Sequence, residues 1–424
     1  MRALAVLAMS FMTLLPFMSL PAQAGGDQSI REQIEELKKQ IERLEEQSQQ
    51  INMKMYEAKD TEAWYNKIKV KTKKGTGLTF QTADKSYELR MRLRSQFLAN
   101  YVNPDGKDDE GFGFRVRRLR VIWDGNAFAP WMKYKVEYDF GRTGELKDMK
   151  LSFAKNKAFV PTVGQYKVPF NREVLNSSSV LQVVGRSIIT DYFEYDRDIG
   201  GGVYGFLGDG MIRYDAGVFQ GEGANQKNDK GDTGMLWAGR VQAAIIGGKA
   251  RSVKENFAKR PTLMVAAAVA GIDVEDGNDG NIGIPSGERA LESGTVTSFT
   301  ADINYRDPRF NLTGEYVGRW ANPDEGGVDT AYDQGFRVQG GFFLLPKKIE
   351  LASRYAMVIF DDGANVLGGN DLDNVWTFTQ GFSYYLSGNH KWKVQLDYTF
   401  QREEDLAGAE SDESMVRAQV QTYF

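Results

Sequence analysis

The chain has 424 residues, and its composition argues against a row of ordinary soluble domains. It contains 45 glycines, 19 tyrosines and 25 phenylalanines but no cysteine, which excludes a disulfide framework and thiolate metal sites. The net charge of -4 and the mean hydropathy of -0.45 do not exclude a membrane protein, because only alternate residues of a spanning β-barrel face lipid.

The first 24 residues predict secretion. Met1-Arg2 supplies positive charge, and the stretch from Ala3 to Leu20 is largely apolar. Ala22-Gln-Ala24 has the small residues of a cleavage site. We therefore expect residues 1–24 to be a signal peptide that is removed, although a retained membrane anchor is the alternative.

Residues 27–58 follow a heptad pattern in which two positions recur at spacings of 4 and 3. They are Ile30, Ile34, Leu37, Ile41, Leu44, Ser48, Ile51 and Met55. Four heptads are marginal as an isolated helix, so the seam needs partners. We predict a periplasmic coiled coil and linker over 25–66; an amphipathic helix lying on something else is the alternative. The residues of the seam do not determine how many helices associate in the coiled coil.

The rest of the chain, 67–424, predicts an all-β fold: a 16-stranded antiparallel transmembrane β-barrel. Two short extended pieces, 67–73 and 78–82, come first. The sixteen candidate strands that follow are 87–102, 112–128, 131–141, 146–154, 159–169, 198–207, 211–220, 234–246, 260–272, 295–305, 310–320, 335–345, 349–359, 375–387, 391–402 and 414–424.

The links between these strands carry further information. Short links such as 208–210 and 346–348 alternate with long polar links such as 321–334. This alternation is typical of bacterial outer-membrane barrels, in which long loops lie outside and tight turns lie in the periplasm. Two links break the pattern: 247–259 is long where a turn is expected, and 142–145 is short where a loop is expected.

Arginines occupy one face of the first two predicted strands. Arg118 breaks the alternation, which predicts a β-bulge near Arg117-Arg118. Such a face is repulsive in a dry core and suits the wall of an aqueous, anion-favouring channel. The predicted lumen residues are Arg90, Arg92, Arg94, Arg115, Arg117, Arg120, Lys133 and Lys135. The alternative is that these cations pair with Glu137, Asp139 and Asp148 and line a wide, weakly selective pore.

The link 170–197 is long and partly apolar, unlike an exposed loop. It follows the fifth strand and therefore begins on the outer side. We expect it to fold into the barrel and narrow the channel; an external loop packed over a neighbouring subunit is the alternative.

Chemistry other than transport finds little support. The only histidine, His390, lies in a predicted periplasmic turn away from any candidate nucleophile, which removes most triad and zinc-site options. We predict no enzyme activity, no catalytic residues, no metal, no cofactor and no nucleic-acid partner.

Several motifs resemble, in order and spacing, the phosphate-selective porin family (porin O and P). The resemblance covers Lys69 to Phe424 and is clearest up to about Gly223. The motifs are Lys71-Thr-Lys-Lys-Gly, Tyr87…Arg94, Arg117-Arg118, Trp131-Met-Lys-Tyr-Lys…Tyr138-Asp139, and Gly164-Gln-Tyr-Lys-Val-Pro-Phe170…Ser177-Ser178…Arg186.

The resemblance implies a trimeric sixteen-strand porin whose third external loop folds inward to form the constriction. In the family, an arginine of the first strand, the arginine pair, a strand aspartate and basic loop residues surround the bound anion. Matching positions here are Arg94, Arg117, Arg118, Asp139 and Arg186. Two positions depart from the family pattern: Ser179 replaces a loop lysine, and Arg120 replaces a tyrosine.

The sequence thus predicts a homotrimeric porin of the bacterial cell outer membrane, embedded in its lipid, for passive diffusion of small anions, with phosphate or polyphosphate as the expected class. The predicted anion-binding set is Arg94, Arg117, Arg118, Arg120, Asp139 and Arg186. The alternatives are a general, weakly selective porin, and a barrel that anchors a coiled coil tethered to peptidoglycan or another periplasmic partner.

Overall fold

A computed structural model describes most of the chain. The described residues are 27–57, 68–72, 77–104, 111–141, 144–226, 234–250, 253–274, 293–324, 330–361 and 372–424. The predicted signal peptide lies outside them, as does the stretch 58–66 of the predicted linker. The chain divides into two compact units, Met1–Lys67 and Ile68–Phe424.

The first unit contains the helix α2 (Asp27–Glu57). Four apolar residues of the predicted seam are exposed on it: Ile34, Leu37, Ile41 and Leu44. No helix in the described part of the chain is both long enough and apolar enough to cross a membrane.

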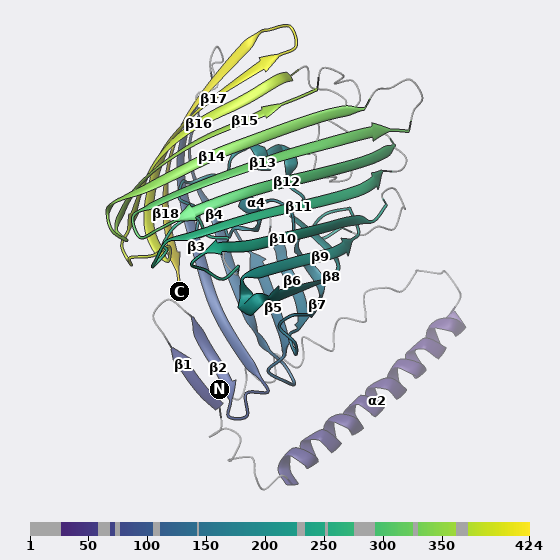
Figure 1. Cartoon of the computed structure of the whole chain (residues 1–424). Helices are drawn as coiled ribbons and strands as arrows, with labels where there is room; N and C mark the ends of the chain where they lie inside the picture. The colour runs from purple at the N-terminus through teal and green to yellow at the C-terminus, as the bar shows by residue number, and fades with distance from the viewer. Residues whose placement is uncertain are drawn as a thin grey trace. The chain divides into compact units, whose positions relative to one another are not determined.

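The second unit is a closed antiparallel barrel of sixteen strands, which confirms the predicted barrel (Figure 1). They are β3 (Glu88–Pro104), β4 (Gly111–Asn126), β5 (Met132–Asp139), β6 (Glu145–Phe153), β7 (Val160–Lys167), β8 (Arg197–Leu207), β9 (Ile212–Phe219), β10 (Leu236–Ile246), β11 (Thr262–Val274), β12 (Gly294–Arg306), β13 (Phe310–Pro323), β14 (Ala331–Leu345), β15 (Ile349–Ile359), β16 (Leu372–Tyr385), β17 (Trp392–Asp405) and β18 (Glu410–Tyr423).

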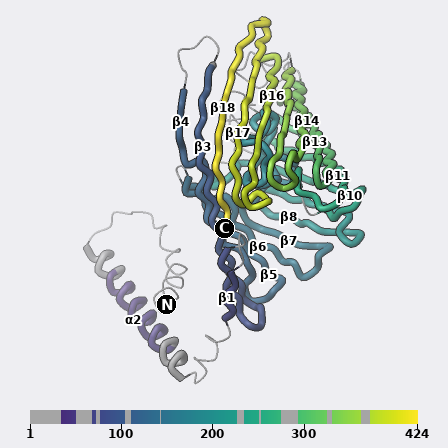
Figure 2. Tube along the Cα trace, turned by 90° about the vertical axis from the view of Figure 1, so that its left-hand side faces the viewer, coloured from purple at the N-terminus to yellow at the C-terminus, as the bar shows by residue number. Residues whose placement is uncertain are grey.

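The barrel closes where the last strand pairs with the first. β18 pairs with β3 from Tyr423 opposite Arg94 to Glu413 opposite Pro104, and Figure 2 shows the two strands side by side. Closure leaves no open edge between β3 and β18, and this is what allows a β-sheet to satisfy its backbone groups in lipid.

A short hairpin extends the sheet at the end that carries the C-terminus. It consists of β1 (Ile68–Thr72) and β2 (Leu78–Thr82). β2 pairs with the first residues of β3, from Gln81 opposite Glu88 to Leu78 opposite Met91. The last strand does not reach this part of β3, because Phe424 pairs with Leu93.

Alternation along the strands separates an apolar outer face from a polar inner face. In β17 the inward side chains Lys393, Gln395 and Asp397 are buried, whereas the outward Trp392 and Leu396 are exposed. The predicted bulge in β4 is confirmed by a register shift between Gln96 and Phe97 of β3. These two residues pair with Arg118 and Val116, so Arg117 is the extra residue.

Two links occupy the inside of the barrel. Residues 168–196, here called the inward segment, connect β7 to β8 and contain α4 (Arg172–Leu175) and α5 (Ile188–Phe193). Most of their side chains are buried, and Figure 1 shows α4 within the curve of the sheet. Residues 253–257, here called the inner link, lie between β10 and β11, and their Glu255 and Asn256 are buried.

A substitution at Gly164 in β7 tests how closely the backbones of the barrel wall are packed. Its φ is +118°, and an added Cβ would lie 2.1 Å from the carbonyl oxygen of Met149. We expect Gly164→Ala to destabilise the barrel by at least about 1–3 kcal/mol, since this conformation is reserved for glycine. Gly239→Ala is the control, because a Cβ there meets nothing within 4 Å. The midpoint of heat-induced unfolding, followed by the gel-mobility shift of the folded barrel, should fall only for Gly164→Ala.

Candidate functional site

A buried carboxylate of α4 holds the inward segment inside the barrel. Glu173 lies 3.3 Å from Nη1 of Arg354 and 3.6 Å from Nε of Arg337, two inward arginines of β15 and β14. The backbone amide of Ser187, farther along the segment, donates to the same carboxylate at 3.0 Å. Glu173 therefore joins the segment to itself and to the wall.

The neighbouring Arg172 attaches the segment to a second part of the wall. Its backbone amide donates to Glu315 at 2.6 Å, and its guanidinium lies 3.0 Å from Asp302. Arg240 of β10 donates to the carbonyl of Phe170 at 2.9 Å and also pairs with Asp302. All of these charged groups are buried, and each is paired, which is the condition for burying charge at tolerable cost.

The middle of the inward segment contacts β3 and β17, across the lumen from β13–β15. Ser178 accepts hydrogen bonds from Arg94 at 3.1 Å and, through its carbonyl, from Gln96 at 3.2 Å. The amide of Val184 donates to Asp397 at 2.7 Å. The segment thus spans the lumen from β13–β15 to β3 and β17.

The inner link meets the inward segment from the other end of the barrel. Glu255 pairs with Arg337 at 3.0 Å, and Asn256 donates to Glu350 at 2.8 Å. The carbonyl of Val253 accepts from Arg172 at 3.2 Å. Together the two links fill the part of the lumen beneath β10–β17.

His390 belongs to this packing. Its Nε2 lies 2.7 Å from Oδ1 of Asn256, and its ring contacts Phe257. Burial and the ammonium of Lys393 lower the pKa of His390 well below its ordinary value, which keeps the imidazole neutral. The histidine joins the β16–β17 turn to the inner link.

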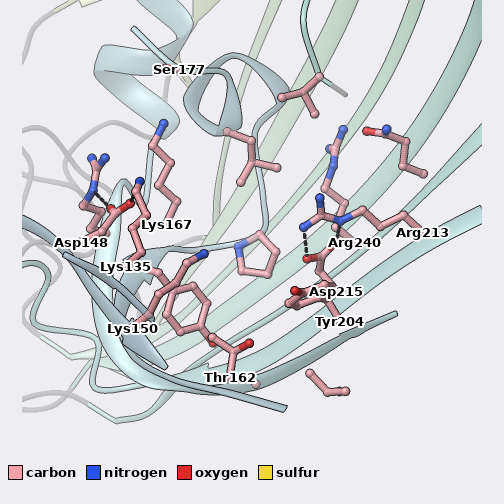
Figure 3. Close-up of a pocket in the computed structure, with 18 of the residues that line it drawn as sticks. Lys135, Asp148, Lys150, Thr162, Lys167, Ser177, Tyr204, Arg213, Asp215 and Arg240 are labelled. Carbon is pink, nitrogen blue, oxygen red and sulfur yellow. Dashed lines mark hydrogen bonds and ion pairs between the residues drawn. The ribbon is translucent and has the colours of Figure 1, made fainter. Parts of the chain in front are cut away.

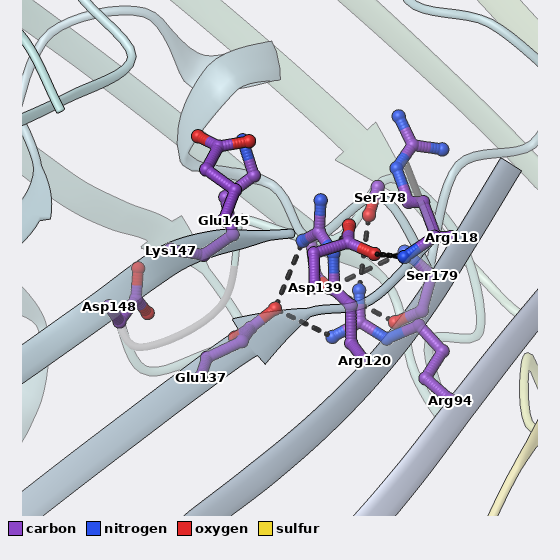
Figure 4. Close-up of polar contacts among 12 residues, drawn as sticks. Arg94, Arg118, Arg120, Glu137, Asp139, Glu145, Lys147, Asp148, Ser178 and Ser179 are labelled. Carbon is purple, nitrogen blue, oxygen red and sulfur yellow. Dashed lines mark hydrogen bonds and ion pairs between the residues drawn. The ribbon is translucent and has the colours of Figure 1, made fainter. Parts of the chain in front are cut away.

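Two of the five arginines in the predicted anion-binding set are paired with acids (Figure 4). Arg94 lies 3.4 Å from Glu137, and Arg120 lies 2.9 Å from the same carboxylate. Arg120 also lies 2.6 Å from Asp139. The structure therefore brings Arg94, Arg120 and Asp139 together, but around Glu137, which is itself buried.

The predicted basic residues nearer the C-terminal end of the barrel also pair with acids, except Lys133. Arg90 and Arg92 both pair with Asp124. Lys135 pairs with Glu137 and with Asp148. Lys133 donates to the side chain of Asn126 at 3.4 Å.

Three predicted residues have no acidic partner within 4 Å among the described residues: Arg117, Arg118 and Arg186. Arg117 donates to the carbonyl of Val184 at 2.7 Å, and Arg118 donates to Gln96 at 2.9 Å. Arg186 donates to backbone carbonyls of its own segment at 3.3–3.4 Å. Arg118 is within electrostatic range of both other arginines. Arg115, farther along β4, is exposed and opposite Leu98.

A cavity of about 450 Å³ lies between β5–β9 and the inward segment (Figure 3). Seven basic side chains line it: Arg120, Lys135, Lys150, Lys167, Arg197, Arg213 and Arg240. Its three acidic side chains are Glu137, Asp148 and Asp215. A second hollow, lined by Arg90, Arg92 and Lys133, shares Lys135, Lys150 and Tyr204 with it. The basic wall is therefore continuous from the C-terminal end inward.

Sequence reasoning missed part of this wall. Lys150 alternates with the exposed Met149 and Leu151 in β6, so the same period of 2 that identified the arginines could have identified it. The inner link had a signal too, since residues 247–259 are long where a turn is expected. Arg213 follows the same period between Ile212 and Tyr214 in β9, whereas Lys167 gave no comparable signal.

A closed barrel of sixteen strands with a charged lumen and an inward-folded link defines a porin-type channel. The sequence model of the family described as phosphate-selective porin O and P matches residues 87–424. The chain belongs to this family and is an outer-membrane barrel protein.

Individual proteins that resemble this chain share only a small part of its sequence. An uncharacterized protein of Aquifex aeolicus is 23% identical over 398 residues, covering 81% of this chain and 89% of that protein. The solved outer-membrane channel DcaP of Acinetobacter baumannii has a TM-score of 0.55 at 12% identity, over 80% of this chain and 97% of its own. The trimer form of Vibrio cholerae OmpT has a TM-score of 0.53 at 12% identity, over 79% and 99%. These two structures share the fold.

The role of Glu173 in holding the inward segment inside the barrel can be tested directly. Glu173→Gln removes the carboxylate that Arg337 and Arg354 share, and breaking a buried pair costs about 3–5 kcal/mol. We expect the inward segment to loosen while the barrel persists. Single-channel conductance should rise and become noisier, and trypsin should cleave at Arg172 or Arg186.

The control is Asp412→Asn, which removes an acid from the more exposed pair with Arg402. Such pairs contribute only about 0–1 kcal/mol, so conductance and cleavage should not change. Unchanged conductance in Glu173→Gln would show that other contacts hold the segment.

Proposed function

We propose that the chain is an outer-membrane porin for passive diffusion of small anions, with phosphate among its permeants. The observation that carries the proposal is the group Arg117, Arg118 and Arg186, which has no acidic partner among the described residues. Arg117 contacts the inward segment directly, so the group lies where that segment narrows the lumen. Cationic rings at a narrow point are the general means by which pores favour anions.

The pairing of the other arginines bears on how strong this preference is. A tight phosphate site needs several donors that are free to converge on one anion. Arg94 and Arg120 instead point to Glu137, and Ser179 bonds to Ser177 at 3.0 Å. We propose that the channel attracts anions by its field more than it captures phosphate, since water and salt screen charges over about 8 Å.

The assembly proposal is a homotrimer with a periplasmic coiled coil formed by three copies of α2. The trimer form of a similar fold supports the first part. The exposed apolar seam on α2 supports the second, because tethering to one barrel trimer raises the local concentration of the helices. In a parallel arrangement, Gln40 and Gln47 would flank the seam and oppose no like charge.

The selectivity proposal is tested with two single variants, Arg117→Gln and Arg118→Gln. We expect the zero-current potential of the reconstituted pore in a KCl gradient to shift toward zero or to the cation-selective sign. Neutralising the acid in Glu137→Gln should shift it in the opposite direction, since Arg94 would lose its acidic partner and Arg120 would keep only Asp139. A pore that is already cation-selective in the unmodified protein would overturn the proposal.

Arg402→Gln serves as the matched control for these charge changes. Arg402 pairs with Glu410 and Asp412 near the far ends of β17 and β18. Removing the same unit charge there should leave the potential nearly unchanged. An equal shift in this variant would mean that net charge, not the constriction, sets selectivity.

The coiled-coil proposal is tested with single cysteines, since the natural chain has none. Leu44→Cys lies in the seam, and Glu46→Cys lies on the opposite face of the same turn. Mild oxidation of the intact protein should cross-link copies only through Leu44→Cys, because a disulfide needs Cα atoms within about 7 Å. No cross-link at Leu44→Cys, together with co-sedimentation of the protein with peptidoglycan, would favour the tether instead.

A further inference from the structure

We propose that the cavity between β5–β9 and the inward segment is a binding site for organic anions. The ligand class is a molecule with one carboxylate or phosphate group attached to an aromatic or aliphatic body. The inference deepens the proposed anion-porin function and rests on it. It concerns a different set of residues from the group Arg117, Arg118 and Arg186.

Basic side chains outnumber acidic side chains in the lining of the cavity. Its three acids are already shared: Glu137 among Arg94, Arg120 and Lys135, Asp148 between Lys135 and Arg197, and Asp215 with Arg213. Acids outside the lining also compensate three of its arginines: Asp139 pairs with Arg120, Asp196 with Arg197 and Asp302 with Arg240. Lys150 and Lys167 are the lining cations with no acid within 4 Å among the described residues, and their charge attracts an entering anion.

Lys150 is the basic group best placed to bind the anionic end. Its ammonium lies 5.6 Å from the centre of the Tyr166 ring, and no acid lies within 4 Å of it among the described residues. A contact with a ring face is weaker than an ion pair, so the lysine gains by meeting a carboxylate or phosphate. Lys167 differs, because it donates to the carbonyls of Val174 and Asn176 and holds the inward segment.

The opposite side of the cavity suits an apolar body. The guanidinium of Arg213 lies 5.4 Å from the ring centre of Tyr204 and 5.7 Å from that of Phe206. Asp215 fixes this arginine through two hydrogen bonds at 2.6 and 2.7 Å. Leu175 of α4 completes the apolar lining. Figure 3 shows Lys150 on one side and Tyr204 with Arg213 on the other.

The size of the cavity separates organic from inorganic anions. A volume of about 450 Å³ is within the range of roughly 300–1,000 Å³ that small-molecule sites occupy. An inorganic phosphate ion would fill a small part of it and leave the ring surface of Tyr204 and Phe206 that Arg213 does not cover in contact with water. A ligand with a ring or short chain would cover them and remove apolar surface from water.

The experiment compares two probes with the same charged group. Phenyl phosphate and inorganic phosphate are added to the pore in a lipid bilayer, and the chloride current is recorded. We expect phenyl phosphate to block at a concentration about tenfold lower, because its ring buries apolar surface. Benzyl alcohol, which has the ring without the charge, should not block.

Two variants assign the effect to the cavity. Lys150→Gln should raise the half-blocking concentration of both phosphates, and Phe206→Ala should raise only that of phenyl phosphate. Lys155→Gln is the control, because Lys155 is an exposed lysine in the β6–β7 turn. Folding of each variant is checked by the gel-mobility shift of the barrel.

The outcomes distinguish this inference from the function on which it rests. Equal block by the two phosphates, or block that Lys150→Gln and Phe206→Ala leave unchanged, overturns the organic-anion site. The zero-current potential in KCl tests the anion preference separately. If that preference is present and the two phosphates block equally, only the cavity assignment fails.

Discussion

The buried carboxylate of Glu173 is the interaction on which the interior depends. Sixteen strands enclose a lumen wide enough for water, and nothing in the strand pattern requires a link to enter it. Glu173 is the acidic partner of the buried Arg354 and a third acid beside Arg337, which also pairs with Glu255 and Glu315. The same carboxylate binds Ser187, so α4 and the start of α5 enter together. Once they are inside, the side of the lumen beneath β10–β17 is filled and the side along β4–β9 remains open.

The charged residues pair differently on the filled side and on the open side of the lumen. On the filled side every named arginine has an acid or a backbone carbonyl within hydrogen-bond distance, as burial requires. On the open side, cations outnumber acids. Among the residues that the structure describes, Arg117, Arg118 and Arg186 donate only to carbonyl and amide oxygens, and Lys150 lies over a ring. The bulge at Arg117 contributes to this arrangement, since an extra residue lets two successive arginines point inward.

The structure explains what Arg120 and Ser179, the two positions that depart from the family pattern, do in this protein. Arg120 sits between Glu137 and Asp139, where its charge is matched rather than presented to the channel. Ser179 offers a hydroxyl that Ser177 already uses and a carbonyl that Gln421 uses. Both positions favour an ordered constriction. The positive field then comes from neighbouring cations without an acidic partner within 4 Å among the described residues, including Lys150.

The sequence by itself determined the barrel. The period-2 alternation predicted sixteen strands to within a few residues, because a strand with lipid on one side and water on the other has no other stable pattern. It also placed the bulge and the arginine face. The sequence could not predict which charges pair, since Arg94 of β3 and Glu137 of β5 are 43 residues apart and meet only across the intervening strand β4. Tertiary structure alone decided which cations are neutralised, because ion pairing depends on distances of a few ångströms that no spacing along the chain encodes.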